Sequence, residues 1–216
     1  MTITNEDNIK LMSRYKDNHF DLAIVDPPYG IKRFQNASNE TSGVYAKRGS
    51  FKSKKSQNWN NLKPNSEYFD ELFRVSKNQI IWGANNFNLP NSEYFLIWDK
   101  KQFMPNFASA ELAFVSIGLK APAKVFRYGI HKENALRKKQ GGKIHQAQKP
   151  VVLYEWILKN YAKENDKIID THLGSGSIAI ACHNLHFDLT ACEINKDYFN
   201  AAMKRINNHK KQLRLF

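Results

Sequence analysis

One strand–helix–strand unit, residues 168–193, constrains the fold of this chain most. A short apolar strand, Ile168-Ile169, leads into the glycine loop Asp170-Thr171-His172-Leu173-Gly174-Ser175-Gly176-Ser177, and the apolar stretch 178–181 continues as a helix. Glycine lets a backbone approach a ligand closely, and a helix N-terminus offers unpaired N–H groups. A second strand ends at Glu193, 17 residues beyond Gly176. An acid about 20 residues beyond such glycines binds ribose hydroxyls in nucleotide-binding α/β units, so this unit predicts a nucleotide-type cofactor.

Further apolar runs alternate with helical patterns along the 216 residues, of which 42% are hydrophobic. Runs rich in Ile, Leu, Val, Phe or Trp predict strands near 21–25, 79–82, 94–98, 111–117, 167–171 and 188–192. Helices are predicted at 66–76, 150–163, 176–185 and 196–212. The alternation is typical of an α/β protein in which helices cover both faces of a mostly parallel, twisted sheet. Residues 1–216 are long enough for one core and are expected to form a single domain.

The tetrapeptide Asp26-Pro27-Pro28-Tyr29 follows the apolar run 22–25, where a buried strand should end. Proline has a fixed φ and no N–H group, so the carbonyls around Asp26 and Pro27 stay free to accept hydrogen bonds from a ligand. A planar base with an exocyclic amino group suits this site, because its two N–H donors need two acceptors and its ring needs a stacking partner. The alternative interpretation is an acidic turn after a strand.

The glycine loop and the tetrapeptide together resemble the S-adenosylmethionine-dependent DNA amino-methyltransferases, which methylate adenine N6 or cytosine N4. The family's catalytic tetrapeptide matches residues 26–29, and its Asp-Pro-Phe-x-Gly-Ser-Gly-Thr cofactor loop matches 170–177, with Thr171, His172 and Ser177 as departures. A His-Pro-x-Gln-Lys-Pro element of the family appears as His145-Gln146-Ala147-Gln148-Lys149-Pro150. Glu6-Asp7-Asn8 stands where the family often has Gly-Asp-Cys.

This resemblance implies a Rossmann-like methyltransferase fold, S-adenosylmethionine as the cofactor, and Asp7 against the cofactor's adenine. Because the tetrapeptide precedes the cofactor loop, the motif order resembles the circularly permuted β group of the family. Trp82-Gly83-Ala84-Asn85-Asn86-Phe87 resembles a segment of some phage-associated members and is expected either to line the target pocket or to form a turn against the core. The residues expected at the cofactor are Asp7, Asp26, Lys149, Asp170, His172, Leu173, Gly174, Ser175, Gly176, Ser177 and Glu193.

In the mechanism that follows, Asp26 and the Pro27 carbonyl accept the two hydrogens of the target amino group, and Tyr29 stacks on the base. The nitrogen lone pair of an arylamine is delocalised into the ring, so the site must aim this lone pair at the sulfonium methyl group. Asp26 is expected to orient the amine more than to act as a strong base. The catalytic set is thus Asp26, Pro27, Pro28 and Tyr29.

An excess of positive charge favours a nucleic-acid substrate, since 33 Lys and Arg against 20 Asp and Glu give a net charge of +13. Residues 30–63 lack apolar periodicity and are longer than the roughly 12–15 residues of ordinary loops. They carry aromatic residues among their cations, so this loop is expected to contact DNA, with a solvated insertion as the alternative. Its expected DNA contacts are Lys32, Arg33, Lys47, Arg48, Lys52, Lys54 and Lys55.

A second basic stretch, residues 124–143, is also expected to contact phosphates. The family order places target recognition in residues 99–143. Because that segment is short, it suggests a short recognition site or help from a second copy of the chain. The expected contacts in this stretch are Arg127, Arg137, Lys138 and Lys139.

Three alternatives to methylation of adenine N6 stay open. Cytosine N4 methylation uses the same geometry, although an initial Asp in the tetrapeptide resembles the adenine enzymes more often. A catalytically silent DNA-binding subunit and an RNA amino-methyltransferase are the other two. The nucleophilic cysteine of carbon-methylating enzymes usually follows a proline, and neither Cys182 nor Cys192 does, so methylation of cytosine C5 is disfavoured. The spacing of these two cysteines also does not fit a metal site.

Two expectations concern location and partners. No apolar run approaches the roughly 18 residues of a membrane span, and the N-terminal residues lack a signal-peptide pattern, so a cytoplasmic location is expected. The pentapeptide Gln212-Leu213-Arg214-Leu215-Phe216 resembles the Gln-Leu-x-Leu-Phe peptides that dock on the bacterial sliding clamp. The alternative is that its apolar residues pack the end of the last helix onto the sheet.

Overall fold

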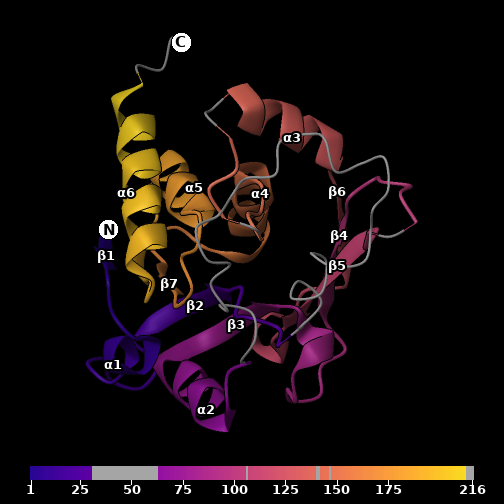
Figure 1. Ribbon diagram of the computed structural model, residues 1–216. Helices are drawn as coiled ribbons and strands as arrows, with labels where there is room; N and C mark the ends of the chain where they lie inside the picture. Colours follow the sequence, from indigo (N-terminus) through magenta and orange to yellow (C-terminus); the bar gives the residue numbers. More distant parts are fainter. Residues whose placement is uncertain (31–62, 106, 140–141, 146, 213–216) are drawn as a thin grey trace.

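The computed structural model describes residues 1–30, 63–105, 107–139, 142–145 and 147–212. Within these residues the core is one eight-stranded sheet with the strand order β1-β8-β7-β2-β3-β5-β4-β6 (Figure 1). The strands are β1 (Thr2–Thr4), β2 (Phe20–Val25), β3 (Ser76–Trp82), β4 (Phe95–Asp99), β5 (Ala110–Val115), β6 (Lys124–Arg127), β7 (Lys167–Asp170) and β8 (Asp188–Cys192). The α-helices are α1 (Asn8–Met12), α2 (Ser66–Val75), α3 (Ile130–Lys139), α4 (Val151–Tyr161), α5 (Ser177–Leu185) and α6 (Lys196–Lys211).

The sheet is mostly parallel, as the alternation of strands and helices predicted. β1, β8, β7, β2 and β3 run parallel to one another. β5 is inserted antiparallel between β3 and β4, and β6 pairs parallel with β4 at the edge. The carboxyl ends of β2, β7 and β8 therefore lie at one edge of the sheet, together with the residues that enter β5.

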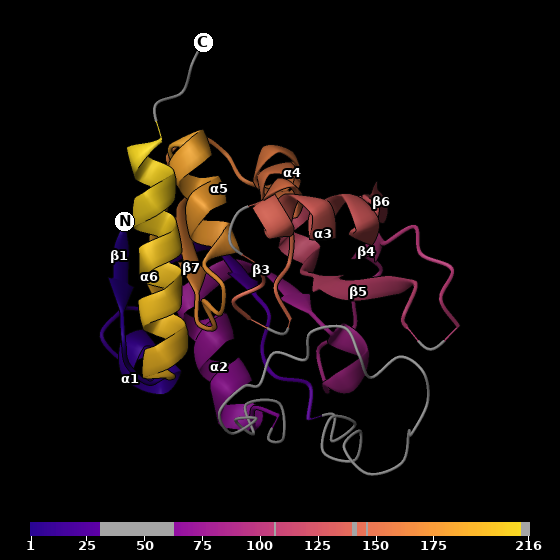
Figure 2. The ribbon, with the colours of Figure 1, turned by 45° about the horizontal axis from the view of Figure 1, so that its top comes forward.

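Helices cover both faces of the sheet (Figure 2). Leu22 and Ile24 of β2 pack on the side of α4, α5 and α6, whereas Ala23 and Val25 pack on the side of α1 and α2. Successive side chains of a strand point to opposite faces, which explains why β2 is buried at every position except the half-buried Asp21 and shows no alternation of polarity over residues 22–25. The fold class is the expected Rossmann-like α/β architecture.

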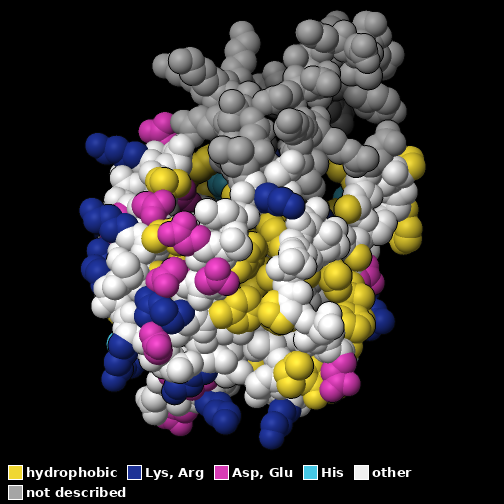
Figure 3. Space-filling model, turned by 90° about the horizontal axis from the view of Figure 1, so that it is seen from below, with side chains coloured by type: hydrophobic (Ala, Val, Ile, Leu, Met, Phe, Trp, Pro, Cys, Tyr) yellow, Lys and Arg dark blue, Asp and Glu magenta, His cyan; other side chains and the backbone are white. Residues whose placement is uncertain are grey.

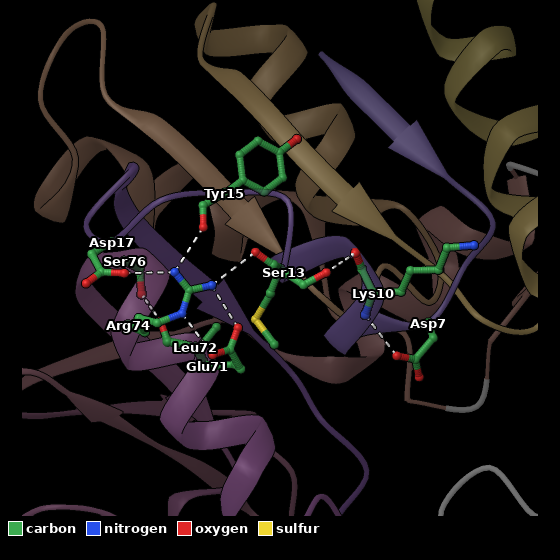
Figure 4. Close-up of polar contacts among 10 residues, drawn as sticks. Asp7, Lys10, Ser13, Tyr15, Asp17, Glu71, Leu72, Arg74 and Ser76 are labelled. Carbon is green, nitrogen blue, oxygen red and sulfur yellow. Dashed lines mark hydrogen bonds and ion pairs between the residues drawn. The ribbon is translucent and has the colours of Figure 1, made fainter.

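A cluster around Arg74 fixes α1 against α2 (Figure 4). The guanidinium of Arg74 forms ion pairs with Asp17 at 2.9 Å and Glu71 at 2.8 Å, and it donates to the carbonyl of Tyr15 at 3.0 Å. At the other end of α1, Asp7 caps the helix and accepts from two backbone N–H groups of its first turn. The position of Asp7 is thereby set by α1, which is itself held by α2.

Four elements were not predicted from the sequence: β1, α1, β6 and α3. β1, β6 and α1 contain only three to five residues, too few for a periodicity to emerge. In addition, β3 begins directly after α2, so its start at Ser76 precedes the predicted start. Among the described residues no helix is long and apolar enough to cross a membrane.

Candidate active site

Three acids of the predicted site meet at the edge formed by the carboxyl ends of parallel strands. Asp26 follows β2, Asp170 is the last residue of β7, and Glu193 follows β8. The register pairs β2 with β7 and β7 with β8, which brings the tetrapeptide beside the glycine loop. Parallel α/β sheets bind ligands at this edge.

The side chain of Asp26 is held by two neighbours. The hydroxyl of Tyr29 donates to Oδ1 at 2.6 Å, and Nζ of Lys149 lies 2.5 Å from Oδ2. Burial raises the pKa of Asp26, and the positive charge of Lys149 opposes that shift. Burial and the negative charge of Asp26 raise the pKa of Tyr29, so its hydroxyl stays protonated and continues to donate.

Lys149 belongs to a chain of alternating charges that the sequence did not predict. Its Nζ lies 3.0 Å from Oε2 of Glu111, and Oε1 of Glu111 lies 2.5 Å from Nζ of Lys100. Burial lowers the pKa of Lys149, but the two carboxylates outweigh this effect and raise it. Burial alone would raise the pKa of Glu111, but Lys149 and Lys100 lower it to about 2. Asp26 and Glu111 therefore share one buried cation.

The ring of Tyr29 lies directly over Gly83. A Cβ atom built on Gly83 would be 2.2 Å from the Tyr29 ring, and the φ of Gly83 is +72°. The far edge of the Tyr29 ring contacts Phe87 with the ring centroids 6.1 Å apart. Trp82 is buried in the core and Gly83 forms a left-handed turn, as the second expectation for residues 82–87 has it, and Gly83, Asn85 and Asn86 also line a cavity together with Tyr29.

A cavity of about 520 Å³ adjoins the glycine loop and one side of the tetrapeptide. Pockets for small ligands span about 300–1,000 Å³, so the space suits a nucleoside-sized molecule. Its lining residues are Glu6, Asp7, Asn8, Asp26, Pro28, His145, Thr171, His172, Gly174, Glu193, Ile194, Asn195 and Tyr198. This lining contains four carboxylates and no Lys or Arg, so it suits a cationic ligand with hydroxyl groups and not a phosphate-bearing one.

Glu193 is fixed at the floor of this cavity. Its Oε2 accepts from the backbone N–H of Gly174 at 2.9 Å, and its Oε1 accepts from that of Asn195 at 2.9 Å. These bonds orient the carboxylate toward the loop and the cavity. The geometry is compatible with a ribose-binding acid, since each carboxylate oxygen has a further lone pair.

The other loop residues fall into two groups. Gly174 and His172 line the cavity, and burial lowers the pKa of His172 to about 4, so its imidazole is neutral near pH 7. Asp170 lies behind them and accepts from the backbone of His172, with burial raising the pKa of Asp170 to about 8. The remaining predicted residues, Leu173, Ser175, Gly176 and Ser177, are not among those that line the cavity.

Ser177 and Ser175 hold the loop through hydrogen bonds to other parts of the fold. The hydroxyl of Ser177 donates to the carbonyl of Lys149 at 2.7 Å, which ties the loop to the residue that holds Asp26. Arg205 of α6 donates to the carbonyl of Ser175 at 2.9 Å. Lys149 itself is not among the residues that line the cavity, and the structure brings it instead to Asp26 and Glu111.

A second cavity of about 320 Å³ lies on the other side of the tetrapeptide. It is lined by Tyr29, Gly83, Asn85, Asn86, Ile97, Ala108, Ala110, Glu111 and Leu112. Asp26 and Pro28 thus face one cavity, and Tyr29 faces the other. Residues 26–29 form the wall between the two spaces.

The predicted DNA contacts are distributed unevenly. Arg127 and Lys138 are exposed, whereas Arg137 is only 4% exposed, pairs with Glu133 at 2.7 Å and donates to the carbonyl of Gln148. Arg137 therefore braces α3 against the segment before α4, and we leave it out of the proposed DNA contacts. The seven cations of the 30–63 loop lie outside the described residues, as do the side chain of Lys139 and residues 213–216.

The net positive charge is not spread over every face. The face that points downward in Figure 1 carries α1 and α2. Figure 3 shows on this face Lys and Arg interspersed with Asp and Glu at the left, and apolar side chains toward the middle. A surface of mixed sign does not suit phosphates as well as a uniformly basic one.

Sequence reasoning missed Glu111 and Lys100 at the site. A signal was present, because Glu111 is the one charged residue of the apolar strand Ala110-Glu111-Leu112-Ala113-Phe114-Val115. A charge in such a strand needs a partner if it is buried. The identity of that partner depends on the antiparallel insertion of β5, which the sequence did not reveal.

Comparison with known proteins gives a consistent set of similarities. Residues 115–204 match the N6_N4_Mtase family model, described as DNA methylase. The chain is 24% identical to the type II methyltransferase M2.LlaDCHI of Lactococcus lactis subsp. cremoris, over 95% of this chain and 88% of that protein. It is also 24% identical to the type II methyltransferase M2.DpnII of Streptococcus pneumoniae, over 95% of this chain and 89% of that protein.

Solved structures share the fold at lower identity. The complex of M1.HpyAVI with SAM superposes with a TM-score of 0.60 and 19% identity, over 94% of this chain and 98% of that one. The cytosine-N4-specific PvuII DNA methyltransferase gives a TM-score of 0.56 and 13% identity, over 96% of this chain and 89% of that one.

Proposed function

We propose that this chain, which belongs to the S-adenosylmethionine-dependent DNA amino-methyltransferases, transfers a methyl group to the N6 amino group of adenine in double-stranded DNA. One observation carries the proposal: residues 26–29 separate a cavity rich in carboxylates from a second cavity that Tyr29 lines. Transfer between two ligands requires such a wall, with the donor on one side and the acceptor on the other.

The first cavity has the hydrogen-bond acceptors that the hydroxyl and amino groups of S-adenosylmethionine need. Its carboxylates match a cationic ligand that carries ribose hydroxyls, and we assign Glu193 to the ribose and Asp7 to the adenine side. Asp7 caps α1 and lines this cavity together with His172 and Gly174 of the glycine loop. When bound, S-adenosylmethionine supplies a methyl group activated by the positive charge on its sulfur.

The chain's own residues position the acceptor. In the proposed mechanism Asp26 and the carbonyl of Pro27 accept the two amino hydrogens, and the ring of Tyr29 stacks on the base. Asp26 uses lone pairs left free by Tyr29 and Lys149, and Lys149 helps to keep the carboxyl ionised. A hydrogen bond to a charged group contributes about 1.5–3 kcal/mol, whereas correct positioning contributes about 7–11 kcal/mol, so positioning dominates.

Adenine is proposed over cytosine because the tetrapeptide begins with Asp, as it more often does in the adenine enzymes of the family. The fold does not distinguish the two bases, since the cytosine-N4-specific PvuII enzyme shares it. A silent DNA-binding role is the remaining alternative, and the intact arrangement of Asp26, Tyr29 and Glu193 argues against it.

Nucleoside mass spectrometry tests this proposal. The protein is incubated with unmethylated plasmid DNA and S-adenosylmethionine that carries a labelled methyl group, and the digested nucleosides are analysed. Labelled N6-methyladenosine in its deoxy form is expected. Labelled N4-methyldeoxycytidine would refute the choice of adenine, and the absence of label from both would refute the activity. A parallel incubation with RNA tests the RNA alternative.

The DNA contacts and partners form a further part of the proposal. We assign phosphate contacts to the exposed Arg127 and Lys138 and to the cations of residues 30–63, and target recognition to residues 99–143. A second copy of the chain would extend a short recognition segment. We place the enzyme with its DNA in the cytoplasm.

A sliding-clamp partner rests on the sequence of residues 212–216, and α6 brings Gln212 to the surface. Deletion of 212–216 is expected to abolish clamp binding in a pull-down and to leave methylation of short duplexes intact. Loss of folding or of methylation on this deletion would favour the packing alternative.

A further inference from the structure

The loop between β4 and β5 presents large apolar side chains to solvent. Phe103 is 94% exposed, Phe107 is 65% exposed and Met104 is 56% exposed. Residues 102–110 contain no charged side chain, although Lys100 and Lys101 precede them and Glu111 follows. Clustered exposed apolar side chains of this size mark an interaction surface. Phe103, Met104 and Phe107 are therefore the candidate contact residues of this loop.

The base of this loop is fixed, so its apolar tip is held away from the core. The side chain of Gln102 is buried and donates from Nε2 to the carbonyl of Ala108 at 2.6 Å. The N–H of Lys100 donates to the carbonyl of Ser109 at 2.9 Å, and the N–H of Phe107 donates to that of Met104 at 3.1 Å. Because these hydrogen bonds already order the loop, its binding to a partner costs little conformational entropy.

The position of the loop connects it to the target site. Ala108 lines the second cavity together with Tyr29, and it also lines a neighbouring hollow of about 340 Å³ that includes Met104 and Phe107. Met104 and Phe107 thus line a hollow that adjoins, through Ala108, the space that we assign to the displaced base.

The charge of this hollow indicates which kind of partner fits it. It is lined by Lys100, His131, Arg137 and Lys143, and by no Asp or Glu. Lys100 is paired with Glu111 and Arg137 with Glu133, so Lys143 is the cation of this hollow that an external anion can meet. Desolvation and the nearby charges of Arg137 and Lys100 lower the pKa of Lys143 to about 8, and the charge of Glu111 opposes this shift. An anionic partner suits this hollow. A second copy of a chain with a net charge of +13 would add positive charge beside it.

We propose that the tip formed by Phe103, Met104 and Phe107 is a wedge that enters duplex DNA beside the target base pair and fills the gap left when the base moves into the second cavity. This assignment rests on the proposed function and adds to it the element that opens the duplex. Apolar side chains inserted between base steps unstack them, and a displaced base leaves an apolar gap of matching size. The exposed side chains of His131 and Lys143, which line the neighbouring hollow, would face the flanking phosphates.

The test compares the double variant Phe103→Ala/Phe107→Ala with the matched control Phe95→Ala. Phe95 is 40% exposed and is the first residue of β4, at the end opposite the loop and outside the segment assigned to target recognition. The methylated sites of plasmid DNA treated with the wild-type enzyme and S-adenosylmethionine are first located by sequencing. Two short duplexes with that site are then made, one with the target base paired and one with it opposite an abasic position.

A wedge is needed only when the target base is paired and stacked. The double variant is expected to methylate the paired duplex at least tenfold more slowly than the wild type. On the abasic duplex it should remain within threefold, and Phe95→Ala should be unaffected on both. Equal loss on both duplexes, no loss on the paired duplex, or a change from dimer to monomer in sedimentation would overturn the wedge. A wild-type enzyme inactive on all DNA would instead refute the proposed function.

Discussion

Replacement of Lys149 with Met should both unfold the protein more easily and stop methyl transfer. Nζ of Lys149 lies 2.5 Å from Asp26 and 3.0 Å from Glu111, and its side chain is only 3% exposed. Removal of one partner of a buried ion pair costs about 3–5 kcal/mol, because it leaves an unpaired buried charge. Glu111 keeps Lys100 as a partner, so the cost should arise mainly at Asp26.

A double-mutant cycle with Asp26→Asn isolates this cost. The variant Lys149→Met/Asp26→Asn lacks both charges, and it should recover most of the unfolding free energy lost by Lys149→Met alone. Burial raises the pKa of Asp26, so without Lys149 the carboxyl can avoid the penalty by taking up a proton. That penalty is absent below the unfolded pKa of about 3.8 and grows as the pH rises through the folded pKa.

Denaturant unfolding at pH 5 and pH 7 measures the cycle. Lys149→Met should lose more stability at pH 7 than at pH 5, and the double variant should show little of this pH dependence. The matched control Glu111→Gln removes the carboxylate shared by Lys149 and Lys100 and keeps the pair between Lys149 and Asp26. If the two single changes were additive in the double variant, the proposed coupling between Lys149 and Asp26 would be wrong.

Three further outcomes are expected. Glu193→Gln should weaken S-adenosylmethionine binding by about 1.5–3 kcal/mol, the scale of hydrogen bonds to a charged group, and unchanged affinity in calorimetry would remove Glu193 from the ribose. Gly83→Ala should cost at least about 2 kcal/mol of stability and most of the methyl transfer, because its Cβ would collide with Tyr29, whereas Gly129→Ala, whose Cβ meets nothing closer than 3.9 Å, should be tolerated. Burial raises the folded pKa of Asp170 to about 8, so the folded state favours the protonated carboxyl. The contribution of this protonated carboxyl to the free energy of unfolding is lost as the pH rises from about 4 to 8. The unfolding free energy of the wild type should therefore fall by about 2 kcal/mol between pH 6.5 and 8 relative to Asp170→Asn, and parallel pH profiles would contradict this pKa.

Local sequence patterns predicted the central part of this fold. Apolar runs located β2, β7 and β8 because these strands are buried on both faces, and the glycine loop located the turn between β7 and α5. The same patterns located Asp26, Gly174 and Glu193 after strands of a mostly parallel sheet, and the structure brings them to one sheet edge because parallel strands bring their carboxyl ends together.

Features that depend on contacts between distant segments could not be predicted in the same way. Arg137 belongs to a basic stretch that suggested phosphate contacts, yet Glu133 one helical turn earlier pairs with it inside the fold. Lys149 resembles a cofactor residue in the family motif, but its burial between Asp26 and Glu111 follows from the insertion of β5 beside β3. The spacing of Glu133 and Arg137 was a usable signal for the first case, whereas the second required the sheet order.

The central claim is that Asp26 stands between the cofactor and the target base and acts on the base. The most direct measurement compares Asp26→Asn with the wild type in two assays, calorimetry with S-adenosylmethionine and methyl transfer to plasmid DNA. We predict a dissociation constant within tenfold of the wild-type value and less than a hundredth of its methyl transfer. A variant that retains more than a tenth of wild-type turnover, or one that loses cofactor binding to the same extent as activity, would contradict the account.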